Sequence, residues 1–79
     1  MPMTPFELRG EYIALDALLK ATGLASSGGT AKAMVADGLV QVDGQTELRK
    51  TCKIRPGQWV ALGSARIQVL AAAGEAAAG

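Results

Sequence analysis

Four of the eight basic residues of this chain fall within seven consecutive positions, namely Arg49, Lys50, Lys53 and Arg55. Residues 1–43 carry a net charge of −2 and residues 44–79 a net charge of +3, so the overall charge of +1 conceals an asymmetry. A local cluster of cations attracts polyanions, and the phosphate backbone of a nucleic acid is one. The pI of about 7.9 is below the value of about 9 typical of dedicated nucleic-acid-binding domains, so we expect a local site.

Catalytic chemistry has few candidate residues. The chain has no histidine and one cysteine, Cys52, so it lacks the commonest general base and any Cys/His set for zinc or for nucleophilic catalysis. Its carboxylates are scattered, and its glycines form no phosphate-binding motif. We therefore expect no catalytic residue, no metal, no cofactor and no small-molecule substrate. Because Cys52 alternates with Leu48 and Ile54, we interpret it as a core residue and not as a redox group.

Length and composition favour one small domain. Seventy-nine residues leave no room for a second module, and the single cysteine suits a reducing compartment. The N-terminal segment has no apolar stretch resembling a signal peptide, and no apolar run approaches the ~20 residues that span a bilayer. We expect a cytoplasmic monomer with no membrane attachment.

Hydrophobic spacing predicts two short helices. Leu15, Leu18 and Leu19 follow the i, i+3, i+4 rule and predict a first helix over 14–22. A second helix is expected to begin after the polar stretch 26–29, where a serine can cap its free N–H groups, and to end at Gly38. Its apolar stripe consists of Ala31, Met34 and Val35.

After Gly38 the pattern changes to strands. Val40 and Val42 alternate with a polar residue, and Asp43-Gly44 predicts a tight hairpin with a returning strand over 46–48. Further turns at 56–57 and 63–64 separate strands over 60–62 and 67–69. We predict an α+β fold: two short helices followed by a small antiparallel sheet of about four to five strands.

The ends of the chain are treated separately. Phe6 and Leu8 alternate, so segment 1–11 is expected to hold an extra strand. The alanine- and glycine-rich segment 71–79 has no apolar period, and we expect it to be a disordered tail. The domain itself is expected to span 12–70.

The order of these elements and two sequence stretches resemble a known family. AKAMVADGLVQVDGQ, at 31–45, resembles the pattern A-R-x-x-I-x-x-G-x-V-x-V-N-G, and KIRPGQWV, at 53–60, resembles x-x-P-G-D-x-I. Both are patterns of the S-four RNA-binding domain, or αL motif, first named for ribosomal small-subunit protein four. The chain is most similar to small free-standing bacterial YbcJ-like proteins, which share its LDALLK-like helix, its S-G-x-x-A-K helix entry and its R-K-x-C-K-I basic segment.

The resemblance implies a non-catalytic protein that binds structured RNA, of the ribosomal or transfer RNA class, and is associated with ribosomes. Carried over by residue, its RNA contacts would be Lys32, Arg49, Lys50, Lys53 and Arg55. Many family members have a basic residue at the position of Gly28, which this chain lacks, although the YbcJ-like subgroup also has small residues there. The alternative function is a protein-interaction module whose basic edge binds an acidic protein.

The turn into the second helix offers candidate phosphate contacts at Ser27, Gly28 and Thr30. Free N–H groups and hydroxyls at a helix N-terminus can bind a phosphate, but capping of the helix explains these residues equally well. For Lys32 the alternative is a surface lysine that covers the edge of the core.

The basic segment has its own period. If 47–55 is extended, Leu48, Cys52 and Ile54 point inward and Arg49, Lys53 and Arg55 share the outer face. Lys50 would then be buried, so we predict a bend near Lys50–Thr51 that exposes it. The alternative for this segment is a solvated strand face without a partner.

The chain has three aromatic residues, Phe6, Tyr12 and Trp59. Trp59 is out of phase with Val60 and should lie on the opposite face of the sheet. The scarcity of aromatic side chains favours recognition of structured RNA by shape and phosphates.

Overall fold

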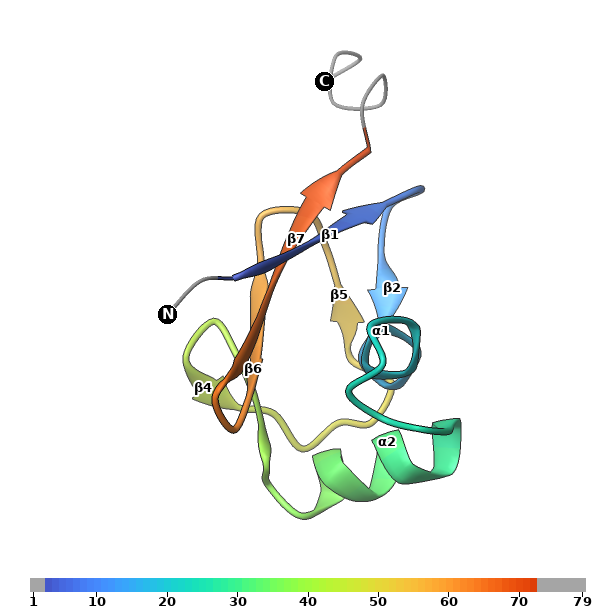
Figure 1. The fold of residues 1–79 in the computed structure, drawn as a ribbon, viewed down its shortest axis with the longest axis vertical. Coiled ribbons are helices and arrows are strands. Elements are labelled where there is room, and N and C mark those ends of the chain that lie inside the picture. Colours follow the sequence, from blue (N-terminus) through green and yellow to red (C-terminus); the bar gives the residue numbers. More distant parts are fainter. Residues whose placement is uncertain (1–2, 73–79) are drawn as a thin grey trace.

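A five-stranded sheet and a separate two-stranded ladder enclose the core together with two helices (Figure 1). The computed structural model describes residues 3–72. Its elements are β1 (Thr4–Leu8), β2 (Ile13–Ala14), α1 (Leu15–Ala21), α2 (Gly28–Ala36), β3 (Val40–Val42), β4 (Gln45–Thr46), β5 (Lys53–Ile54), β6 (Trp59–Leu62) and β7 (Ala65–Ala71). The α+β class and the two helices followed by strands are confirmed.

The larger sheet has the strand order β1-β7-β6-β3-β4. The pairs β3–β4, β3–β6 and β6–β7 are antiparallel, as predicted. β1 instead runs parallel to β7, with Thr4 beside Ile67 and Leu8 beside Ala71, so the sheet is mixed and not wholly antiparallel. The two strands are joined through the rest of the domain, so no tight turn forces them to run antiparallel.

The hairpin between β3 and β4 follows from two residues. Asp43 has φ 52° and Gly44 has φ 86°, which are the positive angles that a two-residue hairpin turn of this kind requires. On β3 the valines are buried and Gln41 between them is exposed. The predicted turn and the predicted alternation are both confirmed.

The helices differ from their predicted bounds by a few residues. α1 buries its three leucines and ends at Ala21, followed by the C-cap residue Thr22, whose N–H donates to the carbonyl of Leu18 at 3.0 Å. α2 already includes Gly28 and Gly29, because Ser27 is its N-cap and accepts a hydrogen bond from the N–H of Thr30 at 3.1 Å. α2 therefore begins earlier than predicted. Gly38 has φ 75°, the left-handed conformation expected after a helix.

The core is built from aliphatic side chains of both helices and of the strands. Its largest fully buried members are Leu15, Leu18, Leu19, Val35, Val40, Ile54, Val60, Ile67 and Val69. Leu48 is not among them, because 61% of it is exposed. The chain leaves the sheet after β4, so the prediction of an inward-facing Leu48 on a continuous strand is wrong.

The last described strand is longer than predicted. β7 continues to Ala71, and the N–H of Ala72 donates to the carbonyl of Leu8 at 3.1 Å. Residues 71 and 72 are thus tied to the sheet, while the rest of the predicted tail, 73–79, lies outside the described residues. Between residues 3 and 72, neither helix has the length and apolar character needed to cross a membrane.

Candidate nucleic-acid interface

The loop 47–52, between β4 and β5, is attached to the start of α1. The N–H of Leu15 donates to the carbonyl of Cys52 at 2.9 Å, and that of Asp16 donates to the carbonyl of Lys50 at 3.1 Å. Ala14, the N-cap residue, offers no side-chain cap, so the loop carbonyls satisfy first-turn N–H groups of the helix. Figure 1 shows the loop reaching the helix just before β5 begins. These backbone hydrogen bonds to α1 therefore fix the position of the loop 47–52.

The loop bends where the sequence predicts. Lys50 and Thr51 form a turn, closed by a hydrogen bond from the N–H of Cys52 to the carbonyl of Arg49 at 3.2 Å. Lys50 is exposed. The bend thus prevents the burial of an unpaired ammonium group, as expected.

Beyond the bend, Lys53 on β5 and Arg55 just after it lie on one face. Lys53 pairs with Ala14 and Ile54 pairs with Ile13 in the ladder with β2. Ile54 is fully buried, whereas Lys53 and Arg55 on either side of it are exposed. The predicted alternation is confirmed for this part of the segment.

Tyr12 lies against both of these cations. Nζ of Lys53 is 4.9 Å from the centroid of its ring, and Cζ of Arg55 is 6.0 Å from it. Tyr12 is 45% exposed. Sequence analysis assigned no role to Tyr12, because its contact with the two cations depends on pairing between β2 and β5, which are distant in sequence and carry no local turn signal.

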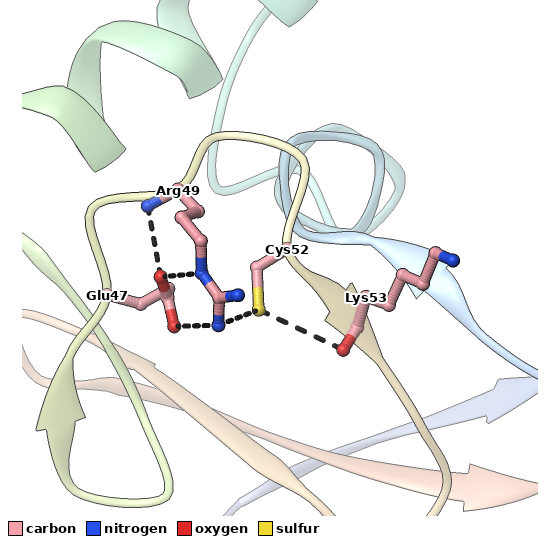
Figure 2. A network of polar contacts seen from close by, with 4 residues as sticks. All are labelled: Glu47, Arg49, Cys52 and Lys53. Atoms are coloured by element: carbon pink, nitrogen blue, oxygen red, sulfur yellow. Dashed lines mark hydrogen bonds and ion pairs between the residues drawn. The ribbon is translucent and has the colours of Figure 1, made fainter.

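Arg49 is engaged by Glu47 (Figure 2). Oε2 of Glu47 accepts from Nε of Arg49 at 2.9 Å and from its backbone N–H at 3.0 Å, and Oε1 accepts from Nη2 at 3.3 Å. These bonds lower the pKa of Glu47 from its ordinary 4.5 to about 2. The pair was not anticipated, because it forms in a loop, where no strand period places the two side chains on one face.

Cys52 packs beside this pair and stays a thiol. Its Sγ is 3.7 Å from Nη2 of Arg49 (Figure 2). Desolvation by burial raises the pKa of Cys52, and the nearby carboxylate of Glu47 adds to the rise. Cys52 also contacts the hydrophobic core. A protonated, half-buried thiol of this kind is a packing residue and a poor nucleophile.

Lys32 reaches the same region from α2. Its Nζ is 4.0 Å from Oδ2 of Asp16 on α1, and the side chains of Lys32 and Asp16 are 52% and 16% exposed. Asp16 is also the residue whose N–H binds the loop at Lys50. Asp16 of α1 therefore contacts both Lys32, through its carboxylate, and the loop, through its backbone N–H.

The five predicted contact residues come from α2, from the loop 47–52 and from β5 with the residue after it, and we call them the basic surface: Lys32, Arg49, Lys50, Lys53 and Arg55. They differ in their surroundings. Lys32 and Arg49 each have a carboxylate partner. No carboxylate of residues 3–72 lies within 4.0 Å of the charged groups of Lys50, Lys53 or Arg55.

Ser27 and Thr30 use their hydroxyls within the helix cap. Oγ of Ser27 lies 3.1 Å from Oγ1 of Thr30 in addition to accepting the N–H of Thr30. Gly28 has open space where a side chain would begin. Capping accounts for both hydroxyls, and a phosphate contact at Ser27, Gly28 and Thr30 stays a prediction.

A hydrogen-bonded network holds the turn after Arg55. The N–H of Arg55 donates to Oε1 of Gln58 at 2.8 Å, and Nε2 of Gln58 donates to Oδ2 of Asp43 at 3.1 Å. Oδ1 of Asp43 accepts the N–H of Trp59 at 3.0 Å. The β3–β4 hairpin is therefore connected to the backbone at Arg55.

Trp59 belongs to a different surface. Cζ of Arg66, on β7, lies 5.5 Å from the centroid of its ring. Val60 is fully buried while Trp59 is half-buried, so the two side chains take opposite faces of the sheet, as predicted.

In the described part of the chain, no three His, Cys, Asp or Glu residues are grouped so as to hold a metal ion.

Comparisons with known proteins agree with this architecture. A family model described as the S4 domain matches residues 6–70. The Escherichia coli (strain K12) protein named "Putative RNA-binding protein YbcJ" is 43% identical over 70 residues, which are 87% of this chain and all of that protein. A protein of Shigella flexneri, named as uncharacterized protein YbcJ, has the same identity and coverage.

A solved structure is also similar. The solution structure of YbcJ from E. coli, described as revealing an αL motif involved in RNA-binding, superposes with a TM-score of 0.70. It is 42% identical in sequence, and the match covers 90% of this chain and 91% of that one. The similarity thus extends over both helices and the sheet.

Proposed function

Because the chain belongs to the S4 domain family, we propose that it binds structured RNA through the basic surface. The observation that carries the proposal is the arrangement of Lys50, Lys53 and Arg55. These three cations are exposed, lie on consecutive parts of one segment, and have no carboxylate of residues 3–72 within 4.0 Å. An RNA phosphate can therefore approach each of them without displacing a protein anion.

Cations of this kind contribute to binding by releasing counterions. Each phosphate contact changes the slope of log affinity against log salt by roughly 0.7 to 0.9. Contacts from all five residues of the basic surface would give a slope of roughly −3.5 to −4.5, and contacts from the three unpaired residues a slope of roughly −2 to −2.7. We expect the smaller value, because Lys32 and Arg49 already neutralise Asp16 and Glu47.

Structured RNA, of the ribosomal or transfer RNA class, is the proposed ligand. Phosphate contacts position a nucleic acid but carry no sequence information, so shape must select the RNA. The minor groove of A-form RNA is wide and shallow and displays 2′-hydroxyl groups, so a protein can recognise it by shape through contacts to hydroxyls and phosphates. We further propose that the protein acts in the cytoplasm as a monomer and does no chemistry on its RNA.

The test compares RNA with DNA. Binding of the purified chain to a stem-loop RNA and to a DNA hairpin of the same sequence is measured over a range of salt concentrations. We expect tighter binding to the RNA and a slope of roughly −2 to −2.7. Equal affinity for both nucleic acids would reduce the site to a simple basic patch. Absence of binding at low salt would reject the proposal and favour an acidic protein as the partner.

A further inference from the structure

Tyr12 lies against two residues of the basic surface, Lys53 and Arg55, and nearly half of it is open to solvent. We propose that its ring stacks on an unpaired nucleobase that adjoins the RNA helix bound by Lys50, Lys53 and Arg55. The inference rests on the proposed RNA binding and narrows the ligand to a helix with an unpaired nucleotide beside it, as at a bulge, a loop or an end.

The first support is exposure. Tyr12 is the most exposed of the three aromatic residues, since Phe6 and Trp59 are both partly buried. Phe6 packs against the core, and Trp59 is half-buried. Of the three rings, that of Tyr12 is therefore the most open to a base.

The second support is the position of the cations around the ring. Lys53 on β5 and Arg55 just after it both lie over the ring of Tyr12, and their backbone positions are two residues apart, roughly 7 Å along an extended chain. A nucleotide within an RNA strand has a flat base and a phosphate on each side of its sugar. Tyr12, Lys53 and Arg55 together therefore offer one nucleotide a ring for its base and two cations for its phosphates.

The third support is the chemistry of stacking. Both faces of a base inside a duplex are covered by its neighbours, so an aromatic side chain can stack only on a base that is splayed out. Stacking of a base on a protein ring typically changes affinity by about 5- to 150-fold and tolerates any base. We therefore expect a preference for an unpaired nucleotide without a preference for its identity.

The same contacts have a purely structural alternative. Cation–π attraction to Tyr12 could serve only to hold Lys53 and Arg55 in place for phosphates. In that case loss of the ring would weaken binding to every RNA alike, whether or not it has an unpaired base.

The experiment uses two RNA stem-loops that differ in a single bulged nucleotide in the stem. The affinities of the full chain and of Tyr12→Leu and Tyr12→Phe are measured for both. We expect the unmodified chain to bind the bulged RNA about 5- to 150-fold more tightly than the fully paired one. Tyr12→Leu should lose this preference while keeping its affinity for the paired RNA and its salt slope, and Tyr12→Phe should keep the preference.

The outcomes separate this inference from the proposed function. Binding of the paired RNA by the unmodified chain tests the proposed function alone. A chain that binds both RNAs equally, or a Tyr12→Leu variant that keeps the preference, would overturn the stacking role. An equal loss for both RNAs in Tyr12→Leu would also overturn it, in favour of the structural alternative. Urea unfolding of each variant verifies that the fold is intact.

Discussion

Arg49 and Arg55 are the two arginines of the basic segment, and their surroundings are opposite. Arg49 lies in the loop, with its guanidinium group bound to the carboxylate of Glu47 at 2.9 Å. Arg55 follows β5 and lies 6.0 Å from the ring of Tyr12, with no carboxylate of residues 3–72 within 4.0 Å. Both side chains belong to exposed residues, but only Arg55 has its charge uncompensated.

The difference shows that a count of basic residues overstates the charge available to a polyanion. The Arg49–Glu47 pair has no net charge, so it attracts a distant phosphate weakly. Arg55 and Lys53 lie on an aromatic face, which attracts a cation without neutralising it. We call Arg49 and Lys50 the loop half of the basic segment, and Lys53 and Arg55 the strand half. The strand half should therefore contribute more to RNA binding than the loop half.

The largest expected effect is the loss of the strand half. In the double variant Lys53→Ala with Arg55→Ala, we expect binding to all RNAs to weaken together and the salt slope to become shallower by roughly 1.4 to 1.8. Titrations of both proteins over the same salt range provide the measurement. Folding should change little, by no more than about 1 kcal/mol, because the core residue Ile54 is retained.

A matched control removes the same charge elsewhere. Arg9 immediately follows β1 and Arg66 lies on β7, so neither residue is in the β2–β5 ladder. Arg9→Ala with Arg66→Ala should leave the salt slope within about half a unit of its original value. If both double variants lose affinity equally, net charge explains the binding and no local site exists.

A smaller, opposite effect is expected in the loop half. Glu47→Gln removes the carboxylate that neutralises Arg49, so RNA affinity should rise and the slope should steepen by roughly 0.7 to 0.9. The double variant Glu47→Gln with Arg49→Gln, which leaves the net charge of the chain unchanged, should bind like the original protein. Weaker binding by Glu47→Gln would mean that Glu47 orients Arg49 for RNA, and the contrast between the two arginines would fail.

The next prediction concerns Cys52, which lies between the two halves. Cys52→Ala should reduce the free energy of unfolding by roughly 1 kcal/mol, because it removes a half-buried group that contacts the core. RNA affinity of the folded variant should not change. Urea unfolding and RNA titration at one salt concentration measure the two quantities. A selective loss of binding with an unchanged unfolding transition would make Cys52 part of the site.

The smallest expected effect is on pH dependence. The pKa of Glu47 is lowered from 4.5 to about 2, so its ionised form stabilises the fold. That contribution is complete above about pH 4.5 and is lost as the pH falls through about 2. Urea unfolding at a series of pH values should therefore show the stability advantage over Glu47→Gln shrinking within this window. An advantage that persists unchanged to pH 2 would contradict the ion pair.

The sequence by itself determined the features that depend on neighbouring residues. The positive φ angles of Asp43 and Gly44 follow from the residues in that turn. The burial of the three leucines of α1 follows from their helical spacing. The exposure of Lys53 and Arg55 around buried Ile54 follows from the period of a strand. The bend at Lys50–Thr51 was also predictable, since a buried lysine without a partner is costly.

Only the tertiary structure decided which distant segments meet. β1 pairs parallel to β7, Leu48 lies in a loop outside the core, and Lys32 meets Asp16 across the two helices. The pairing of β2 with β5 brings Tyr12 to Lys53 and Arg55. Such contacts depend on how the whole core packs, which no local period or turn records. The sequence therefore identified the cations, and the fold determined which of them remain without a carboxylate partner.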